Sequence, residues 1–453
     1  MKITTIAILI LLFSLFTFLT WNFFGVLIIF CIWIFLYLIQ KNQISNVFRS
    51  FFLFYCFFFC YNLFSTFWLY HSEPFYSILI FIINAFLQTL IFFFLYKLSK
   101  FYKNYSFFLL WVAFEILLTK WDLAWPWLIL GNSLANSWYI IQWYSYVGVY
   151  GGSIWIIFFS WYSFKYFFEG KFSMILILLI LPCFISVCQY TSNLNSIDFK
   201  INNQQKIVIF NPSELNTKEP REIKDLVLYF TENTKDSLLI ISPELYYTLD
   251  YPMLNDAEFQ SYLNYYFERN SNSTLLLGVE LINKKDKFNS IFLYNDKQYL
   301  FRTKKKYVPV TEFTHNLLTP FFGETHYSKN KDDDTKKLKI YLKTMPFVCY
   351  EILFSDFVAR NVFDSNYLIL MSSEDFMNGS KYGKRQYDNL VRLRAIENGR
   401  FLIKNSYNGT SSLYSPNGDI VEIFDKTYNI VNIPEINENT VYQKFIYHLH
   451  NLF

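Results

Sequence analysis

The sequence has little charge. Only 17% of its 453 residues are charged, whereas 53% are hydrophobic and 22% are aromatic. Soluble globular proteins carry about 25% charged residues, so this composition excludes an ordinary soluble protein and indicates a membrane protein. The deficit is confined to the part before about Gln189, because Lys, Asp, Glu and Asn reach ordinary density from about Ser192 onward.

Paired cysteines and metal-ligand patterns are missing from the polar half. Five of the six cysteines lie in strongly apolar sequence, and Cys349 alone lies in the C-terminal half. That half therefore needs a hydrophobic core for its stability, because it has no internal disulfide. Its histidines show no metal-ligand spacing, which disfavours zinc chemistry. They are His315, His326, His448 and His450.

Long apolar runs fill the N-terminal part. A helix needs roughly 20 apolar residues to cross a bilayer, and runs near that length predict seven spans. They lie at about 3–20, 22–40, 50–70, 75–97, 106–119, 144–168 and 173–190. The apolar sequence continues past the first run without a cleavage site, so a signal peptide is not expected. The fifth run is the weakest, because it is short and contains Glu115.

Basic residues fall in alternate short loops, as is typical of loops that stay in the cytoplasm. They are Lys2, Lys41, Arg49, Lys97, Lys100, Lys103, Lys165 and Lys171, whereas the opposite loops hold Lys120 and no other basic residue. An odd number of spans with a cytoplasmic N-terminus predicts that everything after Gln189 lies on the outer side. Loss of the fifth span would invert this prediction.

The loop after the fifth run, "KWDLAWPWLILGNSLANSWYIIQW", is too apolar for an ordinary water-exposed connection. Its tryptophans are Trp121, Trp125, Trp127, Trp138 and Trp143. One interpretation is an aromatic belt at the headgroup level, where indoles are enriched. The other is a wall of a lipid-facing entrance to a site just above the membrane. Both interpretations stay open.

Short β-rich runs alternate with helical patterns from Lys206 onward. Strands are predicted at 206–212, 237–245, 273–281, 290–295, 339–351, 366–375 and 400–408, many of them apolar on both faces. Helical spacing predicts helices at 221–233, 256–270 and 387–400, the last ending near Gly399. Strands that are apolar on both faces belong to sheets covered on each side, so these runs predict one layered α/β domain.

Three polar groups of this half recur at strand ends: Glu244 ends "LLIISPE", Lys304 opens the cluster "TKKKYVPVTEF", and Cys349 ends "MPFVC". Each has a plain explanation by itself: a solvated carboxylate, part of a basic patch, and a small buried thiol. Together they fit acyl transfer. A thiol attacks a carbonyl carbon as thiolate and needs a base, which a partly buried carboxylate supplies, while a lysine and a backbone N–H can hold the oxyanion.

The order of these residues resembles the nitrilase superfamily of carbon–nitrogen hydrolases, and the whole chain resembles the apolipoprotein N-acyltransferase family. The matching segments are "SPE" around Glu244, "KKKYVPVTEF" from Lys304, "VCYEILF" around Cys349, Val391–Ile420, "WPWLILGNSLA" and "VGVYGGSIWII". The resemblance implies a polytopic helical membrane domain over 1–191 and a nitrilase-like α-β-β-α sandwich over 192–440. A short tail, 441–453, stands where the family has a terminal transmembrane helix.

The resemblance also implies a reaction. An acyl chain passes from a membrane phospholipid to Cys349 as a thioester, and then to the N-terminal amine of diacylglyceryl-cysteine in an apolipoprotein. Glu244 would act as base and acid, and Lys304 with the Tyr350 amide would stabilise the oxyanion. Glu312, Tyr350 and Glu351 match supporting positions. No cofactor, metal or nucleic acid is implied, and the expected location is the bacterial inner membrane, with the catalytic domain on the periplasmic side.

Two features depart from the family pattern. The usual Pro-Phe-Gly-Glu reads Pro309-Val310-Thr311-Glu312 here, and the chain ends in the tail described above. Two alternatives therefore stay open beside the transferase. One is a membrane-tethered nitrilase-type amidase that uses water as the second acceptor, and the other is an inactive membrane scaffold of the same fold.

Overall fold

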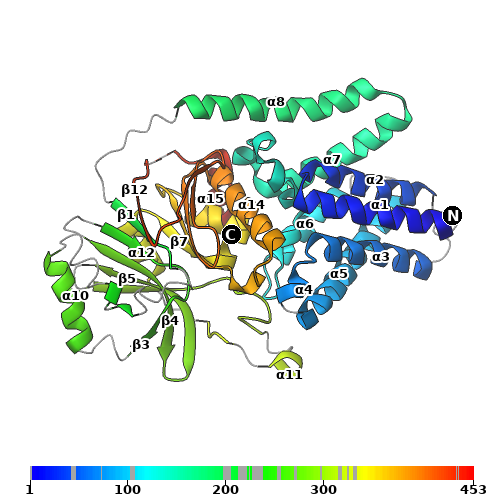
Figure 1. The fold of residues 1–453 in the computed structure, drawn as a ribbon. Coiled ribbons are helices and arrows are strands. Elements are labelled where there is room, and N and C mark those ends of the chain that lie inside the picture. The colour runs from blue at the N-terminus through cyan, green and yellow to red at the C-terminus, as the bar shows by residue number, and fades with distance from the viewer. Residues whose placement is uncertain are drawn as a thin grey trace. The chain divides into compact units, whose positions relative to one another are not determined.

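The chain forms two compact units in a computed structural model (Figure 1). The first comprises Met1–Ser196 and Phe376–Leu393, and the second comprises Ile197–Asp375 and Arg394–Phe453. The structure describes residues 3–41, 47–72, 74–102, 108–196, 206–212, 222–223, 225–226, 238–251, 257–269, 273–295, 298–314, 319–323, 326–329, 334–434, 436 and 438–452.

The first unit is helical. Its elements that precede the second unit in the chain are α1 (Ile3–Asn22), η1 (Gly25–Leu27), α2 (Ile28–Lys41), α3 (Val47–Ser65), α4 (Leu69–Ser72), α5 (Pro74–Phe101), α6 (Leu110–Leu118), η3 (Pro126–Leu128), η4 (Leu130–Ile140), α7 (Tyr144–Phe168) and α8 (Phe172–Ser196). Within the described residues, five of these helices are long and apolar enough to cross a membrane, namely α1, α3, α5, α7 and α8.

Two of the seven predicted spans are shorter than expected. The second forms α2, which has 14 residues, and the fifth forms α6, which has nine. At about 1.5 Å per residue, α6 is only about 14 Å long, roughly half of the ~30 Å hydrocarbon core. Glu115 is buried in α6, and its Oε1 accepts hydrogen bonds from Trp111 Nε1 at 3.1 Å and Leu130 N at 2.8 Å. The fifth predicted span is therefore a short helix whose buried carboxylate is bonded to the backbone of Leu130.

The tryptophan-rich loop folds into the short 3₁₀ segments η3 and η4. Trp121 is 42% exposed, as an interfacial residue would be, whereas Trp127 is only 1% exposed. The Trp127 Nε1 donates to Gln386 Oε1 at 3.0 Å. The belt interpretation therefore suits Trp121 and fails for Trp127, which is part of the interior of this unit.

Gln386 joins several parts of the first unit. It lies on α14 (Lys381–Asn398) and is 3% exposed. Its Oε1 also accepts from Trp68 Nε1 at 3.1 Å, and its Nε2 donates to Ser65 O at 2.9 Å and Asn22 Oδ1 at 3.2 Å. A carboxamide offers two donor hydrogens and two acceptor lone pairs, so these bonds use its full capacity.

The second unit contains two sheets in the described part of the chain. The first has the order β12-β1-β2-β4-β5-β6, with β3 paired to β4, and the second has the order β11-β10-β9-β8-β7. The first sheet's strands are β1 (Lys206–Phe210), β2 (Leu238–Ile241), β3 (Tyr247–Asp250), β4 (Thr274–Asn283), β5 (Asp286–Asn295), β6 (Gln298–Thr303) and β12 (Tyr428–Val431). The second sheet's strands are β7 (Met345–Val348), β8 (Leu368–Ser373), β9 (Leu402–Tyr407), β10 (Ser412–Tyr414) and β11 (Ile420–Ile423).

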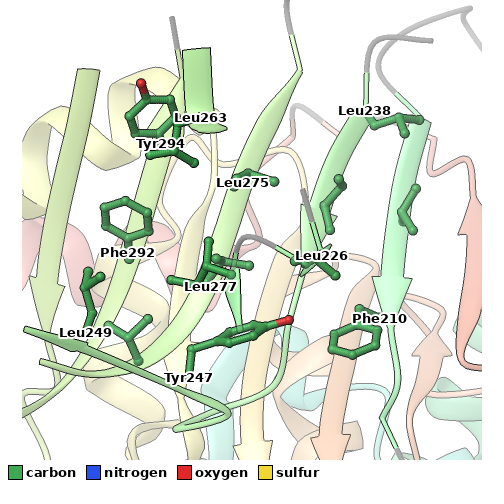
Figure 2. Close-up of a cluster of buried hydrophobic side chains, with 14 of the residues drawn as sticks. Phe210, Leu226, Leu238, Tyr247, Leu249, Leu263, Leu275, Leu277, Phe292 and Tyr294 are labelled. Carbon is green, nitrogen blue, oxygen red and sulfur yellow. The ribbon is translucent and has the colours of Figure 1, made fainter. Parts of the chain in front are cut away.

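The central strands are buried on both faces, which confirms the predicted covered sheets. Figure 2 shows one face of the first sheet, where side chains of β1, β2, β4 and β5 form a cluster with Leu263 of α10 (Ala257–Arg269). Fully burying a leucine-sized side chain stabilises a fold by about 1.5–3 kcal/mol, so this cluster is a main source of stability. The two sheets meet at Asn405 of β9, whose Nδ2 donates to Phe210 O at 3.1 Å and Ile241 O at 2.9 Å.

The remaining helices of the second unit are α11 (Thr319–Phe322), α12 (Thr335–Leu342), η6 (Cys349–Leu353), α13 (Ser355–Asn361), α15 (Val441–Leu452) and the end of α14. The predicted strand at 339–351 is wrong in its first part, which belongs to α12. Leu338 and Leu342 are spaced four residues apart and both are buried, as one helix face requires. The predicted helix at 221–233 lies mostly outside the described residues.

The tail after Thr440 is helical and packs on the second unit. Tyr442 of α15 is 2% exposed, and its hydroxyl lies 2.6 Å from Ser355 Oγ of α13. Ser355 in turn donates to Glu397 Oε2 at 2.9 Å. The residues expected to form a short tail therefore form helix α15, which belongs to the α/β unit.

Candidate active site

The three predicted catalytic side chains follow three strands. Glu244 comes three residues after β2, Lys304 comes directly after β6, and Cys349 comes directly after β7. Ser373, the last residue of β8, contributes its backbone to the same place. Strand ends are where α/β folds usually build sites, because loops there can project side chains without disturbing the sheet.

A glycine makes room for the turn that holds Glu244. A Cβ on Gly278 of β4 would lie 2.1 Å from Pro243 O and 2.7 Å from Glu244 Cα. The Gly278 N–H donates to Ser242 Oγ at 3.0 Å. The turn after β2 therefore lies directly against the backbone of β4, and any larger residue at 278 would displace Glu244.

Lys304 lies between two carboxylates. Its Nζ is 2.9 Å from Glu244 Oε1 and 2.7 Å from Glu312 Oε1. The Lys304 side chain is fully buried, that of Glu244 is 3% exposed and that of Glu312 is 15% exposed. Lys305 and Lys306 are only partly buried, so the structure distinguishes Lys304 from its two neighbours.

Further hydrogen bonds orient the two carboxylates. Asn289 Nδ2 donates to Glu244 Oε1 at 2.7 Å and to Glu312 Oε1 at 3.3 Å. The second oxygen of Glu244 accepts from Ser373 N at 3.0 Å, and that of Glu312 accepts from Val308 N at 2.7 Å. Both carboxylates are thus held from two sides, which fixes their position relative to Lys304.

Cys349 occupies a constrained turn between β7 and the 3₁₀ segment η6. Its φ is +41°, in the left-handed region that non-glycine residues seldom adopt. Such conformations cost of order 1–3 kcal/mol and cluster at functional sites. The thiol is 5% exposed, and its Sγ lies 3.8 Å from Ser373 O. Ser373 therefore contacts both Cys349 and Glu244.

The surroundings of the Cys349 thiol disfavour its ionised form. Burial raises the pKa of Cys349 well above its usual value, and the charge of Glu244 raises it further. Lys304 acts in the opposite direction, while Glu312 and a hydrogen bond to Glu244 again raise the pKa of the thiol. A base next to the thiol is therefore needed to form the nucleophilic thiolate.

The lysine keeps its charge. Burial alone lowers the pKa of Lys304, but Glu244 and Glu312 outweigh it, and the pKa lies well above its usual value. Burial raises the pKa of Glu312, against the opposing effect of Lys304. The site thus favours the charged form of Lys304 and the neutral form of the thiol beside it.

Glu351 ties the loop after β6 to the loop after β7. Its side chain is fully buried, and Arg302 Nη2 lies 2.8 Å from its Oε2. The Lys305 N–H donates to Oε1 at 2.6 Å, and the Val348 N–H donates to Oε2 at 2.9 Å. Glu351 therefore positions the strand ends that precede Lys304 and Cys349.

The altered loop before Glu312 still places the carboxylate on Lys304. Its unusual backbone lies at Val310, whose φ is +69°, a strained conformation for a β-branched residue. The Val310 N–H donates to Phe313 O at 2.8 Å, which closes the turn. Tyr350, which follows the thiol, is 2% exposed and packs edge-on against Phe354.

The segment Val391–Ile420 is mainly structural in its first part. Arg394 Nε lies 3.1 Å from Glu397 Oε2, and both side chains are buried. Arg400 Nε donates to Ser365 O at 2.6 Å, and its Nη2 donates to Asn439 Oδ1 at 3.1 Å. The contacts of Arg400, just after α14, join the segment that follows α13 to the segment that precedes α15.

Sequence reasoning missed Asn289, Arg302 and Ser373. Asn289 lies within β5, so no strand-end signal marks it, and Ser373 acts through its backbone, which any residue type supplies. Arg302 could have been found, because it lies two residues before Lys304 and so on the same face of the strand. A charged residue inside a strand that is otherwise apolar needs a buried partner.

The fold and this site define a nitrilase-like α/β enzyme domain preceded by a helical unit with membrane-spanning candidates. Residues 257–444 match the carbon–nitrogen hydrolase family, and residues 6–162 match the apolipoprotein N-acyltransferase N-terminal domain. The chain belongs to the apolipoprotein N-acyltransferase family.

Relatives in that family align with much of the chain. The apolipoprotein N-acyltransferase of Rickettsia bellii is 27% identical over 405 residues, which cover 81% of this chain and 76% of that protein. The one of Rickettsia prowazekii is 27% identical and covers 75% of this chain and 71% of that protein. The one of Wigglesworthia glossinidia brevipalpis is 31% identical over 189 residues, 38% of each chain. A CN-hydrolase superfamily protein of Xanthomonas campestris is 14% identical, covers 55% of this chain and 94% of that one, and aligns with a TM-score of 0.35.

Proposed function

We propose that this chain transfers an acyl chain from a membrane phospholipid, through a thioester on Cys349, to the N-terminal amine of diacylglyceryl-cysteine in apolipoproteins. The observation that carries the proposal is the buried contact of Lys304 with Glu244 and Glu312 beside the Cys349 thiol. Family membership and the candidate spans support lipid-anchored substrates, because an enzyme in the membrane meets them without extracting them from the bilayer.

The first half-reaction loads the enzyme. Glu244 takes the thiol proton of Cys349, and the sulfur attacks the ester carbonyl carbon of the phospholipid. The ammonium of Lys304 and the N–H of Tyr350, at the start of η6, stabilise the resulting oxyanion. The carbon–oxygen ester bond then breaks, and Glu244 returns its proton to the departing oxygen of the lysophospholipid. The acyl chain remains on sulfur as a thioester.

The second half-reaction unloads it. The free amine of the apolipoprotein attacks the thioester carbonyl, and Glu244 accepts a proton from the nitrogen. The carbon–sulfur bond breaks, an amide forms on the acceptor, and the proton on Glu244 returns to the sulfur. Lys304 keeps its charge throughout, so the same groups serve both steps.

Membrane placement follows from the same proposal. The N-terminus would lie in the cytoplasm and the catalytic unit on the periplasmic side of the bacterial inner membrane, where diacylated lipoproteins and phospholipid headgroups meet. This orientation needs an odd number of spans, which holds for the five long apolar helices of the described residues as it does for the seven predicted spans. A reporter that is active only outside the cytoplasm, fused after Ser196, would give signal, and a cytoplasmic reporter would be silent there.

The deciding experiment incubates purified protein with phospholipid alone and measures the mass of the Cys349 peptide. The transferase accumulates a hydroxylamine-sensitive adduct with the mass of a fatty acyl chain. A diacylated lipopeptide with a free N-terminus discharges it, whereas its N-acetylated form does not. Cys349→Ala should abolish the adduct, and Cys56→Ala should retain it.

The two alternatives give different results in the same experiment. An adduct that decays equally fast with and without lipopeptide, with release of free fatty acid, indicates an amidase-like hydrolase that uses water. Absence of any adduct in the folded wild-type protein indicates an inactive scaffold. Either result would overturn the proposed transfer.

A further inference from the structure

A further buried ion pair lies beside the site and takes no part in the proposed chemistry. Lys404 of β9 contacts Glu374, which directly follows β8, through its Nζ and the Glu374 Oε1. Both residues are 0% exposed. Ser406 Oγ, two residues along β9 on the same face, donates to the same oxygen at 3.0 Å.

Packing alone does not require an ion pair at this place. Taking two charges out of water costs several kcal/mol per ion, and apolar residues of similar volume often give equal or greater stability. A buried pair such as Glu374 and Lys404 therefore suggests that a defined geometry matters here. The neighbouring backbone shows which geometry that is.

Glu374 is bonded to Ser373, the residue that contacts both reacting groups. The Ser373 N–H donates to Glu244 Oε2 at 3.0 Å, and the Ser373 carbonyl lies 3.8 Å from Cys349 Sγ. The Glu374 N–H donates to Tyr407 O at 2.9 Å, which extends the β8–β9 pairing beyond the strand end. The backbone at 373–374 is thus fixed on one side by β9 and presents Ser373 to the thiol and base on the other.

The turn after β9 closes on the same carboxylate. A Cβ on Gly409 would lie 2.1 Å from Glu374 Oε1 and 2.4 Å from Ser406 Oγ. Asn408, with φ +53°, donates through Nδ2 to Asp375 Oδ1 at 2.5 Å. The residues on either side of Glu374 are therefore both anchored, and only glycine leaves room for its carboxylate at 409.

We propose that the Glu374–Lys404 pair is a positioning device that sets the Ser373 peptide, and through it the alignment of Glu244 with the Cys349 thiol. Its role rests on the proposed function, in which Glu244 deprotonates Cys349. Glu374 and Lys404 are positioning residues, because they act on the reacting atoms only through Ser373.

The test uses the full-length protein and p-nitrophenyl octanoate. This activated ester acylates a nucleophilic cysteine with a burst of p-nitrophenol, so the measurement does not require that phospholipid is the natural donor. Replacing the pair in Glu374→Met/Lys404→Met removes both charges together and leaves neither unpaired. We expect the unfolding temperature to stay near that of wild type and the burst rate to fall at least about tenfold, since a 1 Å misplacement near the chemistry can cost ~10²-fold.

A double-mutant cycle with Glu244→Gln separates positioning from a general structural effect. Glu244→Gln alone should slow the burst by about 10²–10⁴-fold, the range for losing a general base. If the pair acts through Glu244, combining the two changes gives no loss beyond that of Glu244→Gln. Losses that multiply, or a wild-type burst rate in the pair variant, would overturn the proposal. A wild-type burst rate in Glu244→Gln would instead overturn the assigned base, and with it the role of the pair.

Two further variants keep the test independent of folding of the pair variant. Gly409→Ala keeps both charges but pushes a methyl group against Glu374, and it should slow the burst in the same non-additive way. Lys404→Arg retains the cation and should recover most of the rate lost in Lys404→Met. The matched control, Arg394→Met/Glu397→Met, removes another buried pair of this unit and should leave the burst rate within about twofold of wild type. A wild-type rate in Gly409→Ala refutes the proposal even if the pair variant does not fold.

Discussion

The Nζ of Lys304 lies 2.9 Å from Oε1 of Glu244, with both side chains almost fully removed from solvent. In this arrangement the ammonium has two tasks. In the proposed reaction it offsets the charge of Glu244, the proposed base, and it favours the thiolate of Cys349 by lowering the pKa of that thiol. The effect of charged neighbours on the pKa of Cys349 can be measured by substituting them.

Lys304→Met should move the pH midpoint for alkylation of Cys349 to higher pH. Lys304 lowers the pKa of the thiol, so removing its charge leaves burial, Glu244 and Glu312 to raise the pKa further. Alkylation with iodoacetamide, followed by mass spectrometry of the Cys349 peptide across a pH series, measures the midpoint. Lys305→Met is the matched control and should leave it in place.

Glu312→Gln should move the same midpoint to lower pH. The Glu312 carboxylate raises the pKa of Cys349, and its neutral isostere removes that contribution while keeping the shape of the side chain. The midpoint should therefore move in opposite directions in Lys304→Met and Glu312→Gln, because the two side chains have opposite effects on the pKa of Cys349. An upward shift or no shift in Glu312→Gln contradicts the electrostatic account of the site.

Glu351→Gln should destabilise the catalytic unit without touching the thiol directly. It leaves Arg302 as a buried cation without its charged partner, a change that typically costs about 3–5 kcal/mol. A loss of that size lowers the unfolding temperature by roughly 10 °C in a unit of this length. The control is Glu280→Gln, whose pair with Lys287 is partly exposed and contributes about 0–1 kcal/mol. Equal shifts in the two variants would contradict the prediction.

Gln386→Leu should destabilise the helical unit. It leaves the indole N–H groups of Trp68 and Trp127 without their shared acceptor, and each buried unsatisfied group costs about 1–3 kcal/mol. Thermal unfolding in detergent, followed by tryptophan fluorescence, should show a lower midpoint. Lys381→Met, at an exposed position of the same helix, should leave the midpoint unchanged.

Val310→Gly should stabilise the protein by about 1 kcal/mol. Releasing a β-branched residue from φ +69° gains of order 1–3 kcal/mol, from which the greater unfolded-state entropy of glycine subtracts about 0.5–1 kcal/mol. Denaturant titration of the purified protein measures the difference. A lower free energy of unfolding in Val310→Gly would show that the turn is not strained.

Periodic patterns in the sequence predicted many of the strands, whereas features that depend on tertiary contacts could not be predicted from it. Runs apolar on both faces identified β1, β2, β4 and β8 because complete burial leaves a compositional mark. The strand end at Cys349 was visible for the same reason. The strand predicted across 339–351 failed in its first part, since Leu338 and Leu342 give a helical spacing that a short apolar run hides.

Only those site residues that act through their side chains could be predicted from the sequence. Glu244, Lys304 and Cys349 stood out because their residue types suit acyl transfer and their order resembles a known family. Ser373 could not stand out, because its backbone makes the contacts. The fifth span was the weakest prediction because its run is short and contains Glu115, but the partner of that carboxylate, the backbone N–H of Leu130, is indicated by no local pattern.

Helix α14 has a consequence for exchanging parts between related proteins. Its residues 381–393 belong to the helical unit, which they contact through Gln386, while Arg394 and Glu397 near its C-terminal end belong to the catalytic unit. A chimera that joins the first 191 residues of one relative to the remainder of another would therefore pair a foreign helix face with Asn22, Ser65 and Trp127. To inherit matched partners, such a swap must carry residues 376–393 together with the helical part, so the genetic unit of exchange is discontinuous in sequence.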